Sequence, residues 1–143
     1  IRDIVRSDQA ARADAGLAHD PALLVPGMHT EEHGLRGVLW LLRQRPTAIL
    51  ASDSTVAAGA LQALAQAGVS VPHDVSIVSF GVPPAVTSVA GGLTMVPTDA
   101  EGVGRRAADK LIGMIERPSD PVGSEVLPLQ LVVGGSTAAP RRE

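Results

Sequence analysis

The chain has no cysteine and almost no aromatic residues. Without cysteine it can form no disulfide, no thiol nucleophile and no thiolate metal site, and this composition is compatible with a cytoplasmic protein. Trp40 and Phe80 are its only aromatic residues, and it has no tyrosine. The core must therefore be built from Leu, Val, Ile and Ala. Sugars often stack on several aromatic side chains. For such a ligand, most of these side chains would have to come from another part of the protein.

The sequence also lacks an excess of positive charge and a long apolar run. The formal net charge is −3 and the pI is about 5.8, whereas binding to nucleic acid depends on neutralising phosphates. No apolar run is long enough to span a bilayer, and no basic segment followed by an apolar one stands at the start. At 143 residues the chain has the length of one domain. We expect a single cytoplasmic domain with no membrane role and no DNA-binding surface of its own.

Residues 47–81 are the most informative stretch, because strand, helix and strand patterns follow one another there. Residues 47–51 form a short apolar run typical of a strand that is covered on both faces. Residues 54–67 carry apolar side chains at helical spacing and are followed by Gly68, a residue type that commonly ends helices. Residues 75–80 indicate a second strand, parallel to the first because such crossovers are right-handed. The pattern predicts an α/β fold, an open parallel sheet with helices on both faces.

Four residues at the ends of these two strands are candidates for contact with a ligand. Ser52 and Asp53 follow the first strand, while Phe80 ends the second and Gly81 comes after it. Ligands of open parallel sheets bind beyond the carboxyl ends of the strands, so these residues are expected at that edge. Asp53 is also well placed to cap the helix that follows, and capping alone would explain its presence.

The first third of the chain predicts a helix, a strand and a second helix. The helices are expected at residues 2–15 and 31–45, where apolar residues recur at helical spacing. A strand is expected between them at residues 22–26. Strand and helix patterns therefore continue to alternate outside the central unit, as an α/β fold requires.

The last third predicts a helix followed by a weak strand. A helix is expected at residues 99–117, because Thr98 and Glu101 have the spacing of a capping box. Residues 126–133 have the pattern of an edge strand, interrupted by Pro128, which cannot donate to a ladder. These two elements lie on either side of a loop rich in Pro, Ser, Asp and Gly.

Two motifs with the letters of a chemical site have simpler explanations. Residues 102–107 match a dinucleotide-binding fingerprint, but both glycines fall inside the predicted helix instead of in a strand-to-helix turn. His29 and His33 stand four apart and could share a metal ion on one helix. Thr30 is the better helix cap, however, which leaves His29 outside the helix. We predict no metal site, no cofactor and no catalytic residue, and we expect no enzymatic activity.

Several segments resemble the effector-binding core of LacI/GalR-type bacterial transcription repressors. The resemblance is specific over residues 47–81, with a Ser-Asp turn, the helix Ala-Ala-Gly-Ala-Leu-Gln-Ala-Leu and the segment Val-Pro-His-Asp-Val-Ser. Residues 93–96, 104–108 and 131–138 are similar to the family less sharply. The resemblance implies a periplasmic-binding-protein-like (type I) subdomain in which a small molecule binds in a cleft shared with a second subdomain.

The resemblance implies an effector site formed by Ser52, Asp53, Phe80 and Gly81, with one departure from the family. In the family, the residue before this Asp and an acidic residue after the Phe commonly reach the effector. Here Gly81 stands where the acidic residue is expected. The usual carboxylate contact with two sugar hydroxyls is therefore missing. The effector is expected to be a small molecule, either a sugar or derivative or a non-sugar ligand.

The resemblance also implies parts of the protein beyond residues 1–143. Regulators of this family carry an amino-terminal helix-turn-helix and a first ligand-binding subdomain. Residues 93–120 resemble the segment that crosses back to pack on that first subdomain. The chain is thus expected to be one effector-binding and dimerisation subdomain, with operator DNA bound only through the absent part. A solute-binding protein of a transport system shares the fold and is the alternative.

A homodimer is expected through the helix at residues 54–67 and the loop that follows the second strand. The helix carries a run of small residues that permits close approach of another backbone, and the loop is apolar. Packing against the sheet would explain the small residues equally well. The resemblance favours pairing, because these repressors pair side by side through the corresponding elements. The expected interface residues are Ala57, Ala58, Leu61, Val82, Pro83 and Val86.

Overall fold

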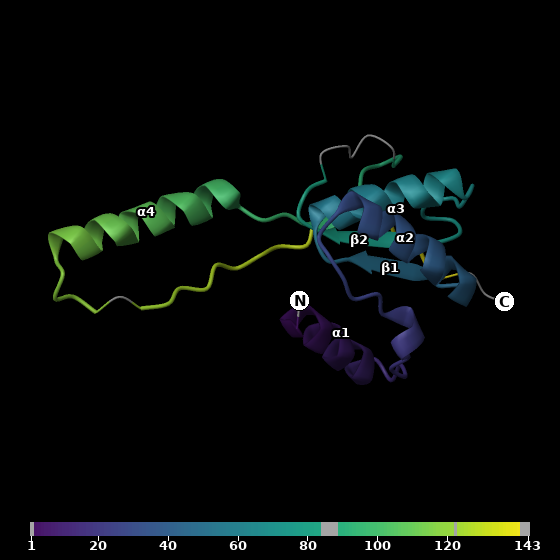
Figure 1. The fold of residues 1–143 in the computed structure, drawn as a ribbon, viewed down its shortest axis with the longest axis horizontal. Helices are drawn as coiled ribbons and strands as arrows, with labels where there is room; N and C mark the ends of the chain where they lie inside the picture. The colour runs from purple at the N-terminus through teal and green to yellow at the C-terminus, as the bar shows by residue number, and fades with distance from the viewer. Residues whose placement is uncertain (1, 84–88, 122, 141–143) are drawn as a thin grey trace.

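The computed structural model describes residues 2–83, 89–121 and 123–140 (Figure 1). Its elements, in chain order, are α1 (Arg2–Asp14), the 3-10 helix η1 (Pro21–Leu23), α2 (Glu31–Leu41), the 3-10 helix η2 (Leu42–Gln44), β1 (Ala48–Ala51), α3 (Ser54–Gln66), β2 (Ser76–Phe80), β3 (Thr94–Val96) and α4 (Ala100–Glu116). The expected alternation of helices and strands is present, and the central strand–helix–strand unit lies within two residues of its predicted bounds.

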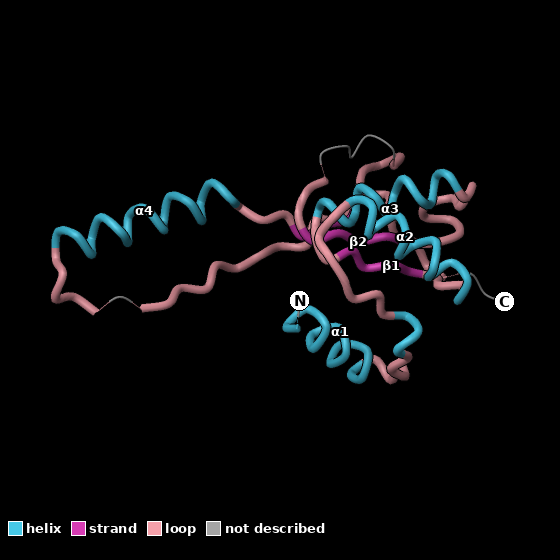
Figure 2. The backbone as a smooth tube through the Cα atoms, in the orientation of Figure 1, coloured by secondary structure: helices cyan, strands magenta, loops and turns pink. Residues whose placement is uncertain are grey.

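The described strands form one parallel sheet in the order β1-β2-β3. β1 and β2 pair in parallel, with Ala48 opposite Ser76 and Ala51 opposite Ser79, so the crossover through α3 is confirmed. β3 continues the sheet on the other side of β2, also in parallel. Helices α2 and α3 lie together over one side of the strands, whereas α1 lies on the opposite side (Figure 2). The predicted parallel sheet with helices on both faces is confirmed.

The core lies where α2 and α3 pack on the sheet, and its residues are aliphatic, as the composition requires. Leu64 of α3 and Ile77 of β2 are fully buried. The two helices approach closely at Gly34 and Gly59. A Cβ atom on Gly59 would collide with the Glu31 carbonyl, and one on Gly34 would collide with a carbonyl of α3. Small residues in α3 therefore serve the contact between two helices of the same chain.

The helix starts show which capping predictions were right. The hydroxyl of Thr30 accepts a hydrogen bond from the His33 N–H at 3.1 Å, so α2 begins after Thr30 and leaves His29 outside the helix, as predicted. For α4 the cap is Asp99, whose carboxylate accepts from the Gly102 N–H at 2.8 Å. Thr98 is therefore not the N-cap, and the predicted capping box is wrong in its register by one residue.

Two predicted strands do not form. Residues 22–26 begin within η1 and then continue as extended chain without a sheet partner among the described residues. Residues 126–133 run as extended chain whose one recorded pairing is an antiparallel bridge between Val132 and Met95. Both segments have strand-like composition, but a strand needs a neighbour for its backbone hydrogen bonds. Among the residues that the structure describes, neither segment has such a neighbour along most of its length.

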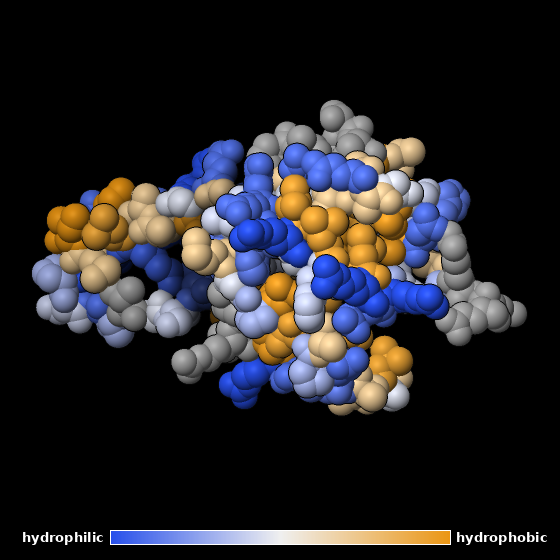
Figure 3. All heavy atoms as spheres, turned by 45° about the vertical axis from the view of Figure 1, so that its right-hand side comes forward, coloured by the Kyte–Doolittle hydropathy of each residue, from blue (hydrophilic) through white to orange (hydrophobic). Residues whose placement is uncertain are grey.

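Helix α4 and the chain that returns from it extend away from the rest of the molecule (Figure 1). None of the α4 residues is buried, although the helix carries apolar side chains near its end (Figure 3). Leu111, Ile112 and Ile115 are 57%, 52% and 72% exposed. We call residues 97–131 the arm. In the part of the chain that is described, no helix combines the length and apolar character needed to cross a membrane.

The chain after the arm returns to the sheet and is fixed there by a buried serine. The Ser136 hydroxyl donates to the Ile77 carbonyl at 2.6 Å and accepts from the Thr94 N–H at 2.8 Å, so it joins β2 to β3. The Ile77 N–H donates to the Ser136 carbonyl at 2.9 Å. Both ends of the arm are thus tied to the same sheet, one through β3 and the other through Ser136.

Candidate functional site

The four predicted ligand-edge residues come together at the carboxyl ends of β1 and β2. Because Ala51 pairs with Ser79, the residues that follow these strands lie at the same edge of the sheet. Ser52, Asp53, Phe80 and Gly81 are all partly buried there. The four residues thus lie at one edge of the sheet, as the prediction assumed.

Asp53 caps α3, as its position after β1 predicted. Its Oδ1 atom accepts hydrogen bonds from the backbone N–H groups of Thr55 and Val56, both at 2.8 Å. These are among the first N–H groups of the helix, which have no partner inside it. The other oxygen, Oδ2, remains for a second set of partners.

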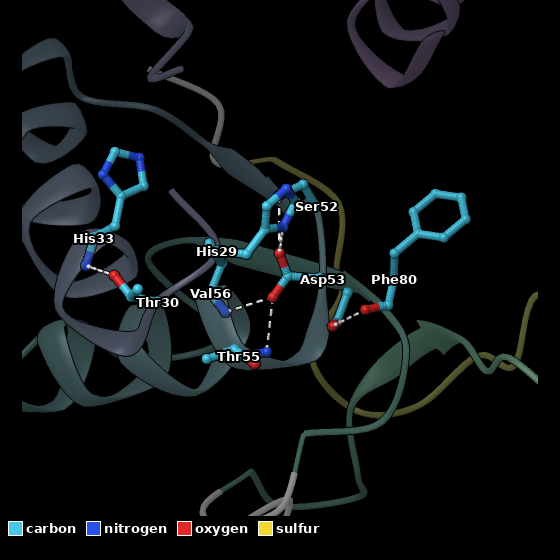
Figure 4. A network of polar contacts seen from close by, with 9 residues as sticks. His29, Thr30, His33, Ser52, Asp53, Thr55, Val56 and Phe80 are labelled. Carbon is cyan, nitrogen blue, oxygen red and sulfur yellow. Dashed lines mark hydrogen bonds and ion pairs between the residues drawn. The ribbon is translucent and has the colours of Figure 1, made fainter. Parts of the chain in front are cut away.

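His29 is the site residue that the sequence did not reveal. Its Nδ1 atom pairs with Asp53 Oδ2, and the Ser52 hydroxyl also points to that oxygen, at 3.5 Å (Figure 4). His29 is 24 positions before Asp53 in the chain, so no local pattern could join them. The one available signal was the Thr30 cap, which places His29 in the loop just before α2.

Asp53 is an ionised carboxylate whose oxygens both have partners inside the chain. Burial raises the pKa of Asp53, but the hydrogen bond from Val56, the adjacent His29 and the hydrogen bond from Thr55 favour the charged form. Together they hold the pKa below its ordinary value. Asp53 therefore orients Ser52 and His29 more than it offers oxygens to a ligand. The half-exposed His29 ring and the Ser52 hydroxyl are the polar groups left to face one.

Phe80 and Gly81 form the neighbouring part of the edge. The ring of Phe80 lies apart from the His29–Asp53 pair (Figure 4). The Gly81 N–H donates to the Val96 carbonyl at 2.8 Å, and Gly81 has a φ of 76°. This left-handed conformation favours glycine over residues with a side chain. Glycine thus takes this turn at no steric cost, and it offers no side chain to a ligand.

The two histidines do not converge on a common point. His33 lies in the first turn of α2 and its ring is directed away from His29 (Figure 4). Across the described ranges, no group of three or more His, Asp or Glu side chains is arranged to hold a metal ion.

The residues predicted for a dimer interface divide into buried and exposed sets. Ala57 and Leu61 are 0% and 8% exposed, and Pro83 is fully buried, so all three pack within this chain. Ala58 is partly exposed and Val82 is 52% exposed. Val86 lies outside the described residues. The chain's own packing therefore removes three of the six positions from direct contact with a partner.

Comparison with known proteins identifies the family and the relatives of this chain. The model of the periplasmic binding protein-like domain matches residues 5–137. The HTH-type transcriptional regulator AglR of Rhizobium meliloti (strain 1021) is 34% identical over 140 residues, which cover 92% of this chain and 39% of AglR. A putative transcriptional regulator LacI from Bacillus cereus subsp. cytotoxis NVH 391-98 superimposes with a TM-score of 0.87 at 27% identity, covering 99% of this chain and 50% of that structure.

A second solved structure carries a ligand. The LacI family transcriptional regulator from Enterococcus faecium with bound ribose superimposes with a TM-score of 0.84 at 25% identity, covering 94% of this chain and 50% of the other. The present chain thus spans well under two thirds of the length of each of these relatives. The chain belongs to the periplasmic binding protein-like domain family, in the group formed by LacI-family regulators.

Proposed function

We propose that this chain is the effector-sensing and dimerising subdomain of a cytoplasmic bacterial transcription repressor. The observation that carries the proposal is the polar cluster of His29, Ser52 and Asp53 at the carboxyl edge of the sheet, in a chain whose relatives are transcription regulators. The same relatives favour a regulator over a solute-binding protein of a transport system. Binding to operator DNA is assigned to a part of the protein outside residues 1–143.

The proposed site binds one side of a small polar molecule. Asp53 holds the His29 ring and the Ser52 hydroxyl in place, and these two groups supply hydrogen bonds while Phe80 supplies an apolar surface. The other side of the molecule would be bound by a second subdomain. A ligand that contacts both subdomains stabilises the arrangement in which they lie close together. That preference is the coupling free energy by which an effector changes the affinity for DNA.

We propose that the arm takes part in the same coupling between effector binding and DNA binding. Leu111, Ile112 and Ile115 are exposed in this chain, and an apolar helix face is normally covered. We propose that this face packs on the second subdomain, because residues 93–120 resemble the segment that does so in the family. Because both ends of the arm are attached to the sheet, movement of the second subdomain would be transmitted to the effector edge.

The test of the effector site needs the full-length regulator that contains this chain. Operator binding is measured by fluorescence anisotropy during titration with a panel of mono- and disaccharides. For a sugar that releases or tightens the complex, Ser52→Ala and His29→Ala should each weaken effector binding about tenfold, which corresponds to one hydrogen bond of about 1.4 kcal/mol. Ser70→Ala and His19→Ala are matched controls at exposed positions. Equal effects of the site variants and the controls would refute the site.

The isolated chain is expected to bind sugars poorly. It lacks the acidic residue after Phe80, it has no second aromatic ring at the edge, and the other side of the cleft is absent. Calorimetric titration against the same panel should show no binding in the micromolar range. Micromolar affinity for any of these sugars would contradict this expectation.

We further propose a homodimer whose contact includes Ala58 on α3 and Val82 after β2, the two predicted interface residues that keep exposed surface. An Arg at position 58 would place an unpaired charge in such a contact, which is costly. Sedimentation of the wild type and of Ala58→Arg at matched concentration tests this, with Ala13→Arg on the exposed surface of α1 as control. A monomeric wild type, or an Ala58→Arg variant that still pairs, would rule the interface out.

A further inference from the structure

The proposed site has one carboxylate, and both of its oxygens have partners inside the chain. The residues of the site are His29, Ser52, Asp53, Phe80 and Gly81. Asp53 uses Oδ1 to accept from two backbone N–H groups of α3, and its Oδ2 atom pairs with His29. The other four residues carry no acidic group, and Gly81 has no side chain at all. A ligand therefore meets no free carboxylate among these five residues.

A neutral sugar is poorly matched to such a site. Each of its hydroxyl groups has a proton to donate, and a buried donor without an acceptor costs free energy. Two side-chain atoms of the five residues remain as acceptors, the Ser52 oxygen and, when the ring is neutral, Nε2 of His29. A ligand with several hydroxyl groups would leave some of its donors without a side-chain acceptor on this side of the cleft.

The same residues offer hydrogen-bond donors. Nδ1 of His29 is directed at Asp53, which leaves Nε2 of the half-exposed ring for a ligand (Figure 4). Asp53 is the charged group that contacts this ring among the described residues, and the ring of His33 is directed away from it. The Ser52 hydroxyl reaches Asp53 Oδ2 only at 3.5 Å, so it is free to turn to a ligand. With a proton on each ring nitrogen, His29 is a cation beside a hydroxyl donor.

We infer that the effector carries an anionic group, a carboxylate or a phosphate, which binds to the His29 ring and the Ser52 hydroxyl. The oxygens of such a group are acceptors that need no acceptor in return, so they match what these two residues offer. Hydrogen bonds between a cation and an anion are also roughly twice as strong as those between neutral groups. This inference rests on the proposed function, because it names the chemical class of the effector for the same site.

Binding of an anion at His29 is coupled to a proton. The anionic oxygen needs a proton on Nε2, while Asp53 holds the other proton on Nδ1. A ring that is neutral before binding must therefore take up one proton, and the affinity for the anion falls as the pH rises through the range in which histidine ordinarily loses its charge, about pH 5 to 8. A carboxylate ligand keeps its charge in this range, whereas a phosphate changes its own. A sugar acid thus isolates the contribution of the ring.

The test is calorimetric titration of the full-length regulator with matched sets of ligands. Each set contains a neutral sugar, its acid and its phosphate: galactose, galacturonate and galactose 6-phosphate, and glucose, glucuronate and glucose 6-phosphate. The member of a set that binds shows which anionic group is recognised. Three variants are compared with the wild type. His29→Gln removes the positive charge, His29→Lys keeps a charge that does not titrate near neutral pH, and His19→Gln is the control at an exposed position.

In at least one set, the acid or the phosphate should bind about tenfold or more tightly than the neutral sugar. His29→Gln should weaken binding of that anion about tenfold and change binding of the neutral sugar less than about twofold, whereas His19→Gln should change neither. Between pH 6 and pH 8 the affinity of the wild type for a sugar acid should fall by up to about tenfold per pH unit. His29→Lys should bind the acid without this pH dependence.

Three results would overturn the inference. A neutral sugar that binds as tightly as its acid and its phosphate would do so and leave the proposed function in place. An equal loss for neutral and anionic ligands in His29→Gln would do so too, because the ring would then act through its shape and not its charge. If no compound of the panel binds or changes the affinity for operator DNA, the inference and the proposed function are both overturned.

Discussion

The unit β1–α3–β2 and the arm have similar helices in different surroundings. Both helices are capped by an Asp, Asp53 in one and Asp99 in the other, and both carry apolar side chains at helical spacing. In α3 these side chains are buried against the sheet and α2, with Leu64 1% exposed. In α4 no residue is buried. The local sequence therefore sets where both helices begin and end. Burial against other elements of the described chain stabilises α3 but not α4.

The largest expected difference between the two regions concerns a leucine in each helix. Leu64→Ala should lower the free energy of unfolding by about 2 to 5 kcal/mol, because it leaves a cavity in the core. Leu111→Ala removes the same atoms from a side chain that is 57% exposed and should change it by less than about 0.5 kcal/mol. Urea denaturation of both variants measures this. Equal losses would show that α4 belongs to the same core, and a large loss for Leu111→Ala in the full-length protein would support the second subdomain as its partner.

A glycine in each helix gives the next contrast. Gly59→Ala should destabilise the chain by about 1 to 3 kcal/mol through crowding against the Glu31 carbonyl, reduced by up to about 1 kcal/mol of improved helix propensity. At Gly104 of α4 a Cβ atom meets nothing within 4 Å. Gly104→Ala should therefore only gain helix propensity and raise the helical circular dichroism signal slightly. A Gly59→Ala variant that is more stable than the wild type would mean that α2 and α3 do not pack through this contact.

Loss of the N-cap aspartate should lower the free energy of unfolding by about 1 kcal/mol more in α3 than in α4. Asp53→Ala removes the acceptor for two backbone N–H groups of a core helix and should cost about 1 kcal/mol, whereas Asp53→Asn and Asp53→Ser retain an oxygen and should cost less. Asp99→Ala should fray α4 without a comparable loss of global stability. Chemical denaturation of the four variants decides between these outcomes. If all three Asp53 variants lose the same amount, the carboxylate has a role beyond capping.

The smallest expected effect is on the pH dependence of the free energy of unfolding. The folded pKa of Asp53 lies below its ordinary value, so the unfolded chain takes up the proton first as the pH falls. The stabilisation is complete above about pH 4, the usual range for Asp, and is lost as the pH falls through the folded pKa. Because the side chain is partly exposed, the effect should stay below about 1 kcal/mol. The stability gap between the wild type and Asp53→Asn should narrow between about pH 5 and pH 3; a constant gap would contradict this explanation.

The prediction from sequence was accurate where the signal is local. The bounds of α2, α3 and α4 follow from periodicity, capping residues and helix-ending residues, all of which act within a few positions. The parallel pairing of β1 and β2 follows from the helical crossover, through α3, between them. The edge at which Ser52 and Asp53 meet Phe80 and Gly81 follows from that pairing, because parallel strands end at the same side of a sheet.

The prediction failed where a segment depends on a distant partner. Residues 22–26 and 126–133 have strand composition, but a strand forms only when another backbone satisfies its hydrogen bonds. His29 could not be assigned to the site, because its partner Asp53 is 24 positions away. The small residues of α3 suited a dimer contact and packing against the sheet equally well, and neither reading foresaw the close approach of Gly59 to α2.

The sequence by itself determined the fold class, the aliphatic core, the positions of the helices and the sheet edge at which Ser52, Asp53, Phe80 and Gly81 lie. These properties depend on side-chain size, periodicity and caps, which each segment carries within itself. Tertiary structure alone decided that His29 joins Asp53, that Ala57, Leu61 and Pro83 are buried, and that no residue of α4 is buried by the described part of the chain. Those outcomes depend on which surfaces meet after folding, because burial and pairing are properties of two segments together and neither segment encodes them alone.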